Sequence, residues 1–220
     1  MATQEELFNH PGWQACNRLG AFANMHNIFM ENYNQFKGLC DKLNYNDSPS
    51  NELKKEIFMH LERYIFNYLS SASALIEHSR HLTSFYKDTD FYTEYNKRIK
   101  NVFEKNDLAL FIKKLRNYQV HVGLPCPYIV ASLKDTKYWD IVFISQELLD
   151  KKNDWNLESK KFINTCGKEI ILNDVFYQYT NLVNSFYLWV YEELKKYHKD
   201  ELIEKERIEK ELGIFVPSII

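Results

Sequence analysis

Three polar residues near the middle of the chain have the types and spacing needed for acid–base chemistry on a phosphate ester. Arg116 and Asn117 are adjacent, and His121 follows Arg116 after five positions. Histidine changes its charge near neutral pH and can transfer protons, while the planar guanidinium of arginine matches a phosphate in two-point contact. RNA supplies its own nucleophile in the 2′-OH, so these residue types are compatible with RNA cleavage that needs no metal ion.

The three residues fall at the end of a predicted amphipathic helix. Asn106 or Asp107 is expected to cap this helix, and Gly123 predicts that it ends near Val122, with His121 in its last turn. Its apolar face contains Leu108, Phe111, Ile112 and Leu115.

The positions of the arginine and the histidine on this helix also predict an oligomeric state. Residues five apart on a helix lie ~140° apart in rotation and ~7.5 Å apart along the axis. One copy of the chain is therefore poorly placed to present Arg116 and His121 to the same phosphate, whereas two copies related by a dyad can do so. We expect a homodimer with a composite site.

The rest of the chain predicts a mainly α-helical fold, a bundle of long antiparallel helices with one small β-hairpin insertion. Apolar residues recur at helical spacing over 13–43, 57–86, 90–104 and 173–197, and two shorter helices are expected over 145–151 and 156–166. Residues 128–133 and 138–144 are rich in β-branched and aromatic residues and read as the hairpin. The small residues at 70–74 predict the close approach of a neighbouring helix.

No internal repeat or low-complexity linker occurs, so residues 1–220 are expected to form a single domain. Glutamate and lysine dominate after His198. Residues 199–220 are therefore expected to form a charged helical extension that leaves the body of the domain, as a projecting end or a dimer arm.

Composition limits the classes of partner. The chain has 220 residues, 45% of them hydrophobic, with 15 Tyr and 15 Phe, which predicts an aromatic-rich core. The net charge of -2 gives no overall attraction for polyanions, so any nucleic-acid contact must be local. Residues 94–116 contain seven basic and three acidic residues, a local charge of +4 that includes Lys113 and Lys114 as candidate RNA-binding residues.

Other kinds of site receive less support. No glycine-rich phosphate loop occurs, so no nucleotide cofactor is expected. Glu77, His78 and His81 have spacing that suits a metal ion, but no second Glu-x-x-His completes a bundle site, and an interfacial pair of histidines is the simpler interpretation. We therefore expect neither a metal nor another cofactor.

The cysteines and the N-terminus bear on the cellular compartment. The four cysteines form no Cys-x-x-Cys pair and are expected to be reduced, and buried or inert. The N-terminus is acidic and polar, and no apolar run approaches the ~18 residues of a transmembrane span. Together these features predict a cytoplasmic protein with no membrane contact.

The segment Leu115-Arg116-Asn117-Tyr118-Gln119-Val120-His121 resembles the defining motif of the HEPN superfamily, in which Arg and often a polar residue such as Asn precede a His by a few positions. A looser similarity extends to the helix around residues 67–80 and to the aromatic final helix. The resemblance implies a HEPN-like bundle, and an endoribonuclease that acts as a toxin or phage-defence effector with a possible neutralising protein partner. Carried over by position, it implies that Arg116 and His121 are catalytic and that Asn117 supports them.

The chain departs from one HEPN branch, the toxins paired with nucleotidyltransferase antitoxins, because Gly123 stands where those toxins have a tyrosine two residues after the motif histidine. A nucleotidyltransferase partner is therefore not implied. Two other interpretations stay open. The chain is a non-catalytic helical module that binds a protein or RNA partner, or the motif is structural, with Arg116 paired to a carboxylate, Asn117 bonded to backbone and His121 stabilising a helix end.

Overall fold

The computed structural model describes residues 2–45, 48–133, 137–150 and 155–214, and it confirms a mainly α-helical fold with a small antiparallel sheet. The helices are α1 (Gln4–Asn9), α2 (Pro11–Asn44), α3 (Asn51–Thr83), α4 (Asp90–Ile99), α5 (Asp107–His121), α6 (Ser145–Asp150), α7 (Leu157–Thr165), α8 (Leu172–Tyr197) and α9 (Lys199–Leu212). The strands are β1 (Tyr128–Leu133), β2 (Lys137–Ile144) and β3 (Glu169–Ile171).

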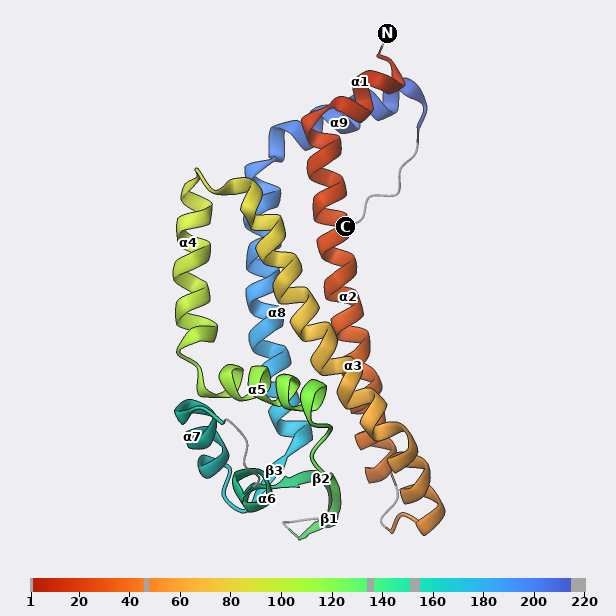
Figure 1. Ribbon diagram of the computed structural model, residues 1–220. Helices are drawn as coiled ribbons and strands as arrows, with labels where there is room; N and C mark the ends of the chain where they lie inside the picture. The colour runs from red at the N-terminus through yellow and green to blue at the C-terminus, as the bar shows by residue number, and fades with distance from the viewer. Residues whose placement is uncertain (1, 46–47, 134–136, 151–154, 215–220) are drawn as a thin grey trace.

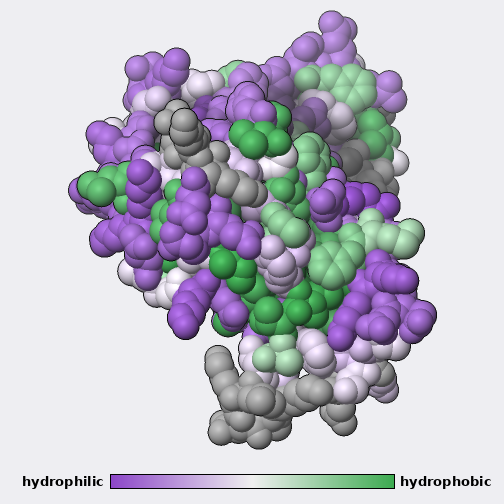
Figure 2. Space-filling view, turned by 60° about the horizontal axis from the view of Figure 1, so that its bottom comes forward, coloured by the Kyte–Doolittle hydropathy of each residue, from purple (hydrophilic) through white to green (hydrophobic). Residues whose placement is uncertain are grey.

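The long helices set the shape of the molecule. α2, α3 and α8 run along its length, α3 and α8 in the direction opposite to α2, with α4 beside them (Figure 1). α5 crosses the bundle near the end that carries the sheet, α6 and α7, whereas α1 and α9 lie at the opposite end. Seen from the sheet end, the surface shows a hydrophobic patch bordered by hydrophilic residues (Figure 2).

Side-chain caps fix where the predicted helices begin. The backbone N–H of Leu53 donates to Ser50 Oγ at 3.1 Å, and that of Ala109 donates to Asn106 Oδ1 at 3.1 Å. Each cap satisfies an N–H group that has no partner within its helix. The helix expected over 90–104 is α-helical to Ile99 and then widens into a π-helical turn, Lys100–Glu104, which leads into the loop before α5.

The core is rich in aromatic rings, as the composition predicts. Tyr68 of α3 is fully buried, and its ring packs 4.3 Å from that of Phe176 of α8. Its hydroxyl donates to the Phe176 carbonyl at 3.1 Å and lies 2.9 Å from Thr180 Oγ1, so the buried polar atom is satisfied. Burial also raises the pKa of the Cys40 thiol to about 12, which keeps that cysteine unreactive.

The sheet has the order β1-β2-β3, with both pairings antiparallel. The hairpin of β1 and β2 agrees with the sequence prediction, although its turn at 134–136 lies outside the described residues. β3 was not predicted. It has three residues, too few for a periodic pattern, and it pairs only with Val142–Ile144 of β2.

Asn44, the last residue of α2, binds β2 beyond the end of this short third strand. Its Nδ2 donates to the Trp139 carbonyl at 2.8 Å, and its Oδ1 accepts the Trp139 N–H at 2.7 Å. The side-chain amide therefore takes the place of a neighbouring strand and connects the helical bundle to the sheet.

Replacement of Asn44 with alanine is expected to lower the free energy of unfolding by about 2 kcal/mol, because it leaves the Trp139 N–H and carbonyl without these partners. Denaturant unfolding followed by circular dichroism measures the change. Asn32→Ala is the matched control, since Asn32 lies in the same helix and its amide donates to the Ile28 carbonyl of that helix. An equal loss in both variants would contradict the role assigned to Asn44.

α9 differs from the projecting extension expected for residues 199–220, of which residues 215–220 lie outside the described part of the chain. It is helical and charged, as predicted, but it packs against α1 and α2. Lys205, Ile208 and Glu209 are buried, and Lys205 Nζ lies 2.9 Å from Glu209 Oε1. The long lysine stem covers apolar surface while its charge is paired, so a sequence dominated by charge can still have a packed face.

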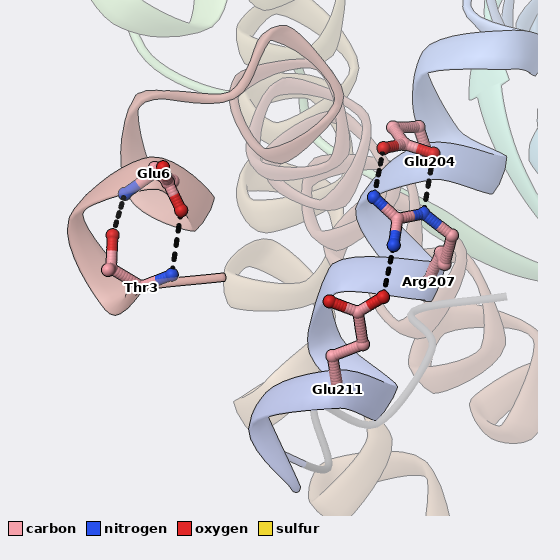
Figure 3. A network of polar contacts seen from close by, with 5 residues as sticks. All are labelled: Thr3, Glu6, Glu204, Arg207 and Glu211. Carbon is pink, nitrogen blue, oxygen red and sulfur yellow. Dashed lines mark hydrogen bonds and ion pairs between the residues drawn. The ribbon is translucent and has the colours of Figure 1, made fainter. Parts of the chain in front are cut away.

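Local polar contacts stabilise α1 and α9 individually (Figure 3). Thr3 and Glu6 form a capping box, in which each backbone N–H donates to the other side chain at 2.8 and 3.2 Å. On α9, Arg207 forms ion pairs with Glu204 and Glu211.

None of the helices in the described part of the chain has the length and apolar character that crossing a membrane requires.

Candidate functional site

The helix that carries the motif is fixed at both ends. At its start, Asp107 pairs with Lys161 of α7 at 2.7 Å. Nearer its end, Tyr118 stacks on Trp155 with ring centroids 5.9 Å apart, and Phe111 stacks on the same indole at 5.7 Å. These contacts set the rotation of α5 and so determine which way its polar side chains face.

Arg116 and Asn117 line a cavity of about 260 Å³ between α3, α5 and the π-helical turn, with Tyr179 of α8 also in its wall. Arg116 is half-buried, and one of its terminal nitrogens donates to Asn117 Oδ1 at 3.3 Å. Its Nε is buried and has no hydrogen-bond partner among the described residues. The structure therefore places two of the three predicted site residues together.

The charge of Arg116 is not neutralised by the rest of the described chain. No carboxylate in residues 2–45, 48–133, 137–150 and 155–214 lies within 4.0 Å of its guanidinium, although Glu77 and Glu104 border the same cavity. Glu77 is instead paired with Arg80 at 2.6 Å. The buried Nε of this guanidinium is therefore a donor that an anion could use.

His121 lies apart from this cavity. It is the last residue of α5 and is exposed, and the helix is closed by the Val122 N–H, which donates to the Tyr118 carbonyl at 2.8 Å. Gly123 follows with a φ of 122°, a conformation that favours glycine and turns the chain toward β1. The arginine and the histidine thus face different surroundings within one copy of the chain.

The two candidate RNA-binding lysines also lie in different surroundings. Lys113 is exposed and borders the cavity together with Arg116, whereas Lys114 is half-buried and does not contribute to the lining. Among the described residues, the cavity lining includes three cationic side chains, Arg80, Lys113 and Arg116, and two carboxylates, Glu77 and Glu104.

Arg80, Glu77 and Glu104 are charged residues of the cavity lining that the sequence did not nominate for this site. The signal was the run of small residues at 70–74, which we interpreted as a close helix contact. Ala72 and Ser73 from this run line the cavity, so the small side chains leave open space between α3 and α5. The clue in the sequence was the spacing of three or four residues between Ser73, Glu77 and Arg80, which places them on one face of a helix.

The alternative cluster of Glu77, His78 and His81 is dispersed. Glu77 pairs with Arg80, and the His78 ring stacks 6.4 Å from Phe22, while that of His81 contacts Phe85 at 5.4 Å. In the part of the chain that the structure describes, no three His, Cys, Asp or Glu side chains are grouped to hold a metal ion. Of the four cysteines, which are expected to be reduced and buried or inert, Cys40 is buried and Cys126 is exposed, and all four are free thiols.

Comparisons of the chain with protein-family models, with curated proteins and with solved structures find no match.

Proposed function

We propose that the protein is a metal-independent endoribonuclease of HEPN type, with Arg116, Asn117 and His121 in a composite site formed by two copies of the chain. The observation that carries the proposal is the half-buried Arg116 guanidinium, which lines a cavity and has no paired carboxylate among the described residues.

The surroundings of Arg116 suit a phosphate. Lys113 and Arg80 border the same cavity, and Asn117 Oδ1 accepts from the guanidinium and orients it. Because Arg80 is paired with Glu77, the three cations and two carboxylates of the described lining leave a net charge of only +1, and the hydrogen bond from Arg116 to Asn117 restricts the rotation of the guanidinium plane. In the proposed role, Arg116 holds the phosphate that is cleaved.

The exposure of His121 suits a group that meets its substrate at an interface between two protomers. Val120 and Val122 flank it, with 46% and 66% of their surfaces exposed. These apolar side chains offer contact area to a second copy, whose Arg116 would then lie near this histidine. We propose the dyad-related arrangement because Arg116 and His121 are separated within one protomer.

The proposed reaction uses only groups of the RNA and the protein. The 2′-oxygen attacks the adjacent phosphorus, a 2′,3′-cyclic phosphate forms, and the bond from phosphorus to the 5′-oxygen breaks. A base takes the 2′-OH proton and an acid protonates the leaving 5′-oxygen, and His121 supplies one of these two functions. The Arg116 guanidinium stabilises the charge that develops on the phosphate oxygens.

Incubation with RNA in EDTA tests the proposal. We expect the purified protein to cut single-stranded RNA in the presence of EDTA, giving a 2′,3′-cyclic phosphate and a 5′-hydroxyl. The same oligonucleotide with deoxyribose throughout should stay intact, because it lacks the nucleophile. The products are resolved by mass spectrometry.

Two results would count against this chemistry. Cleavage of the all-deoxy oligonucleotide at a similar rate would exclude attack by the 2′-OH, and loss of activity in EDTA would exclude a metal-independent reaction. RNA left intact under all conditions would favour the non-catalytic module that binds a partner through the same surface.

A further inference from the structure

A second cavity lies where the start of α2 meets α8 and α9, at the opposite end of the molecule from α5 (Figure 1). Its volume is about 280 Å³, close to the lower limit of about 300 Å³ that is usual for small-molecule sites. Leu19, Leu202 and Tyr191 contribute apolar walls. It shares no lining residue with the cavity beside Arg116, so nothing inferred from it depends on the proposed ribonuclease activity.

The charged groups around this cavity are mainly basic. Its described lining contains Lys195, Lys199 and Lys205, with Glu206 as the carboxylate. Lys205 is buried and paired with Glu209, but Lys195 and Lys199 have no carboxylate within 4.0 Å among the described residues. The neighbouring Lys196, by contrast, is paired with Glu193 at 2.9 Å.

We infer that this cavity binds a medium-chain aliphatic carboxylate. The apolar walls suit a hydrocarbon chain, and the two lysines without ion-pair partners complement a single negative charge at its end. A cationic amphiphile would meet like charges there. The small volume limits the ligand to a short or medium chain.

Cys16 lines the cavity and provides a direct test. Octanoate added to the full-length protein should slow the alkylation of Cys16 by a maleimide, measured at each cysteine by mass spectrometry. Cys126 is exposed and lies outside the cavity, so its alkylation should not change. Affinity should rise about fourfold for each added methylene, which makes hexanoate about fifteen-fold weaker than octanoate.

Paired variants separate the carboxylate contact from simple apolar burial. Lys195→Gln combined with Lys199→Gln should weaken octanoate binding by up to about fivefold for each lysine replaced. Lys196→Gln is the matched control and should bind octanoate like the parent, because that lysine does not line the cavity. Lys196 and Lys199 are exposed and Lys195 is half-buried, all near the junction of α8 and α9, and their substitution should leave thermal unfolding unchanged.

The inference would be overturned if octanoate failed to protect Cys16, or if it protected Cys126 to the same extent. Protection by octyltrimethylammonium equal to that by octanoate would also overturn it, since a cavity selective for a carboxylate rejects a cation. Full retention of affinity in the double lysine variant would rule out the assigned charge contact.

Discussion

Replacement of His121 with alanine is expected to reduce metal-independent RNA cleavage by about 10²–10⁴-fold, the usual contribution of a positioned proton-transfer group. The fold should be unaffected. His121 is exposed at the end of α5, and substitutions of exposed side chains usually change the free energy of unfolding by less than about 0.5 kcal/mol. Cleavage rates in EDTA and a thermal melt of the same preparation measure the two quantities together.

His81→Ala is the matched control, because His81 is also an exposed histidine near the C-terminal end of a helix but lies on α3. It should cleave RNA at the parental rate. An equal loss in the two variants would mean that the histidine in the motif has no special role. Unchanged cleavage by His121→Ala would contradict its assignment as the acid or base.

Mixing two inactive variants tests the composite site itself. In a dimer that takes Arg116 from one protomer and His121 from its partner, a heterodimer of Arg116→Ala and His121→Ala retains one intact site of two. Random exchange of protomers should then restore about one quarter of the parental activity. No recovery would favour a site that is complete within one protomer and would contradict the dyad arrangement.

The long helices were predictable because each signal is local. Apolar residues recur at the helical period along α2, α3 and α8, and Ser50, Thr89 and Asn106 each cap the helix that follows. The predicted ends therefore agree with the structure to within a few residues. The position of His121 in the last turn of α5 followed from Gly123 by the same local reasoning.

Features that depend on contacts between distant residues were not predictable. Asn44 reads as a turn residue at the end of a helix, and only the fold places it against Trp139, 95 positions later. The burial of α9 likewise depends on contacts with a distant part of the chain. Lys205 is buried because its charge is paired with Glu209 and its side chain packs on the start of α2. At the candidate site, Arg116 and Asn117 were identified from the motif, but the cavity beside them arises from the packing of α3 against α5.

Gly12 is the position where a single methyl group should have the largest effect on stability. A Cβ atom there would lie 2.1 Å from the carbonyl oxygen of Glu201 and 2.6 Å from its carbonyl carbon. Backbone atoms cannot rotate away as a flexible side chain can, so α9 would have to move from the start of α2. Gly12→Ala should therefore lower the free energy of unfolding by about 1–3 kcal/mol, the usual cost of overpacking.

For a chain of this length, such a loss corresponds to a fall of about 3–10 °C in the melting temperature, which differential scanning calorimetry measures. Gly38→Ala in the same helix is the matched control, because nothing lies within 4 Å of its added Cβ. That variant should gain about 0.5–1 kcal/mol, since alanine loses less backbone entropy than glycine when it becomes helical. Opposite signs for two identical substitutions in one helix would show that α9 packs on α2. A gain in both variants would instead mean that α9 leaves the body, as its charged sequence first suggested.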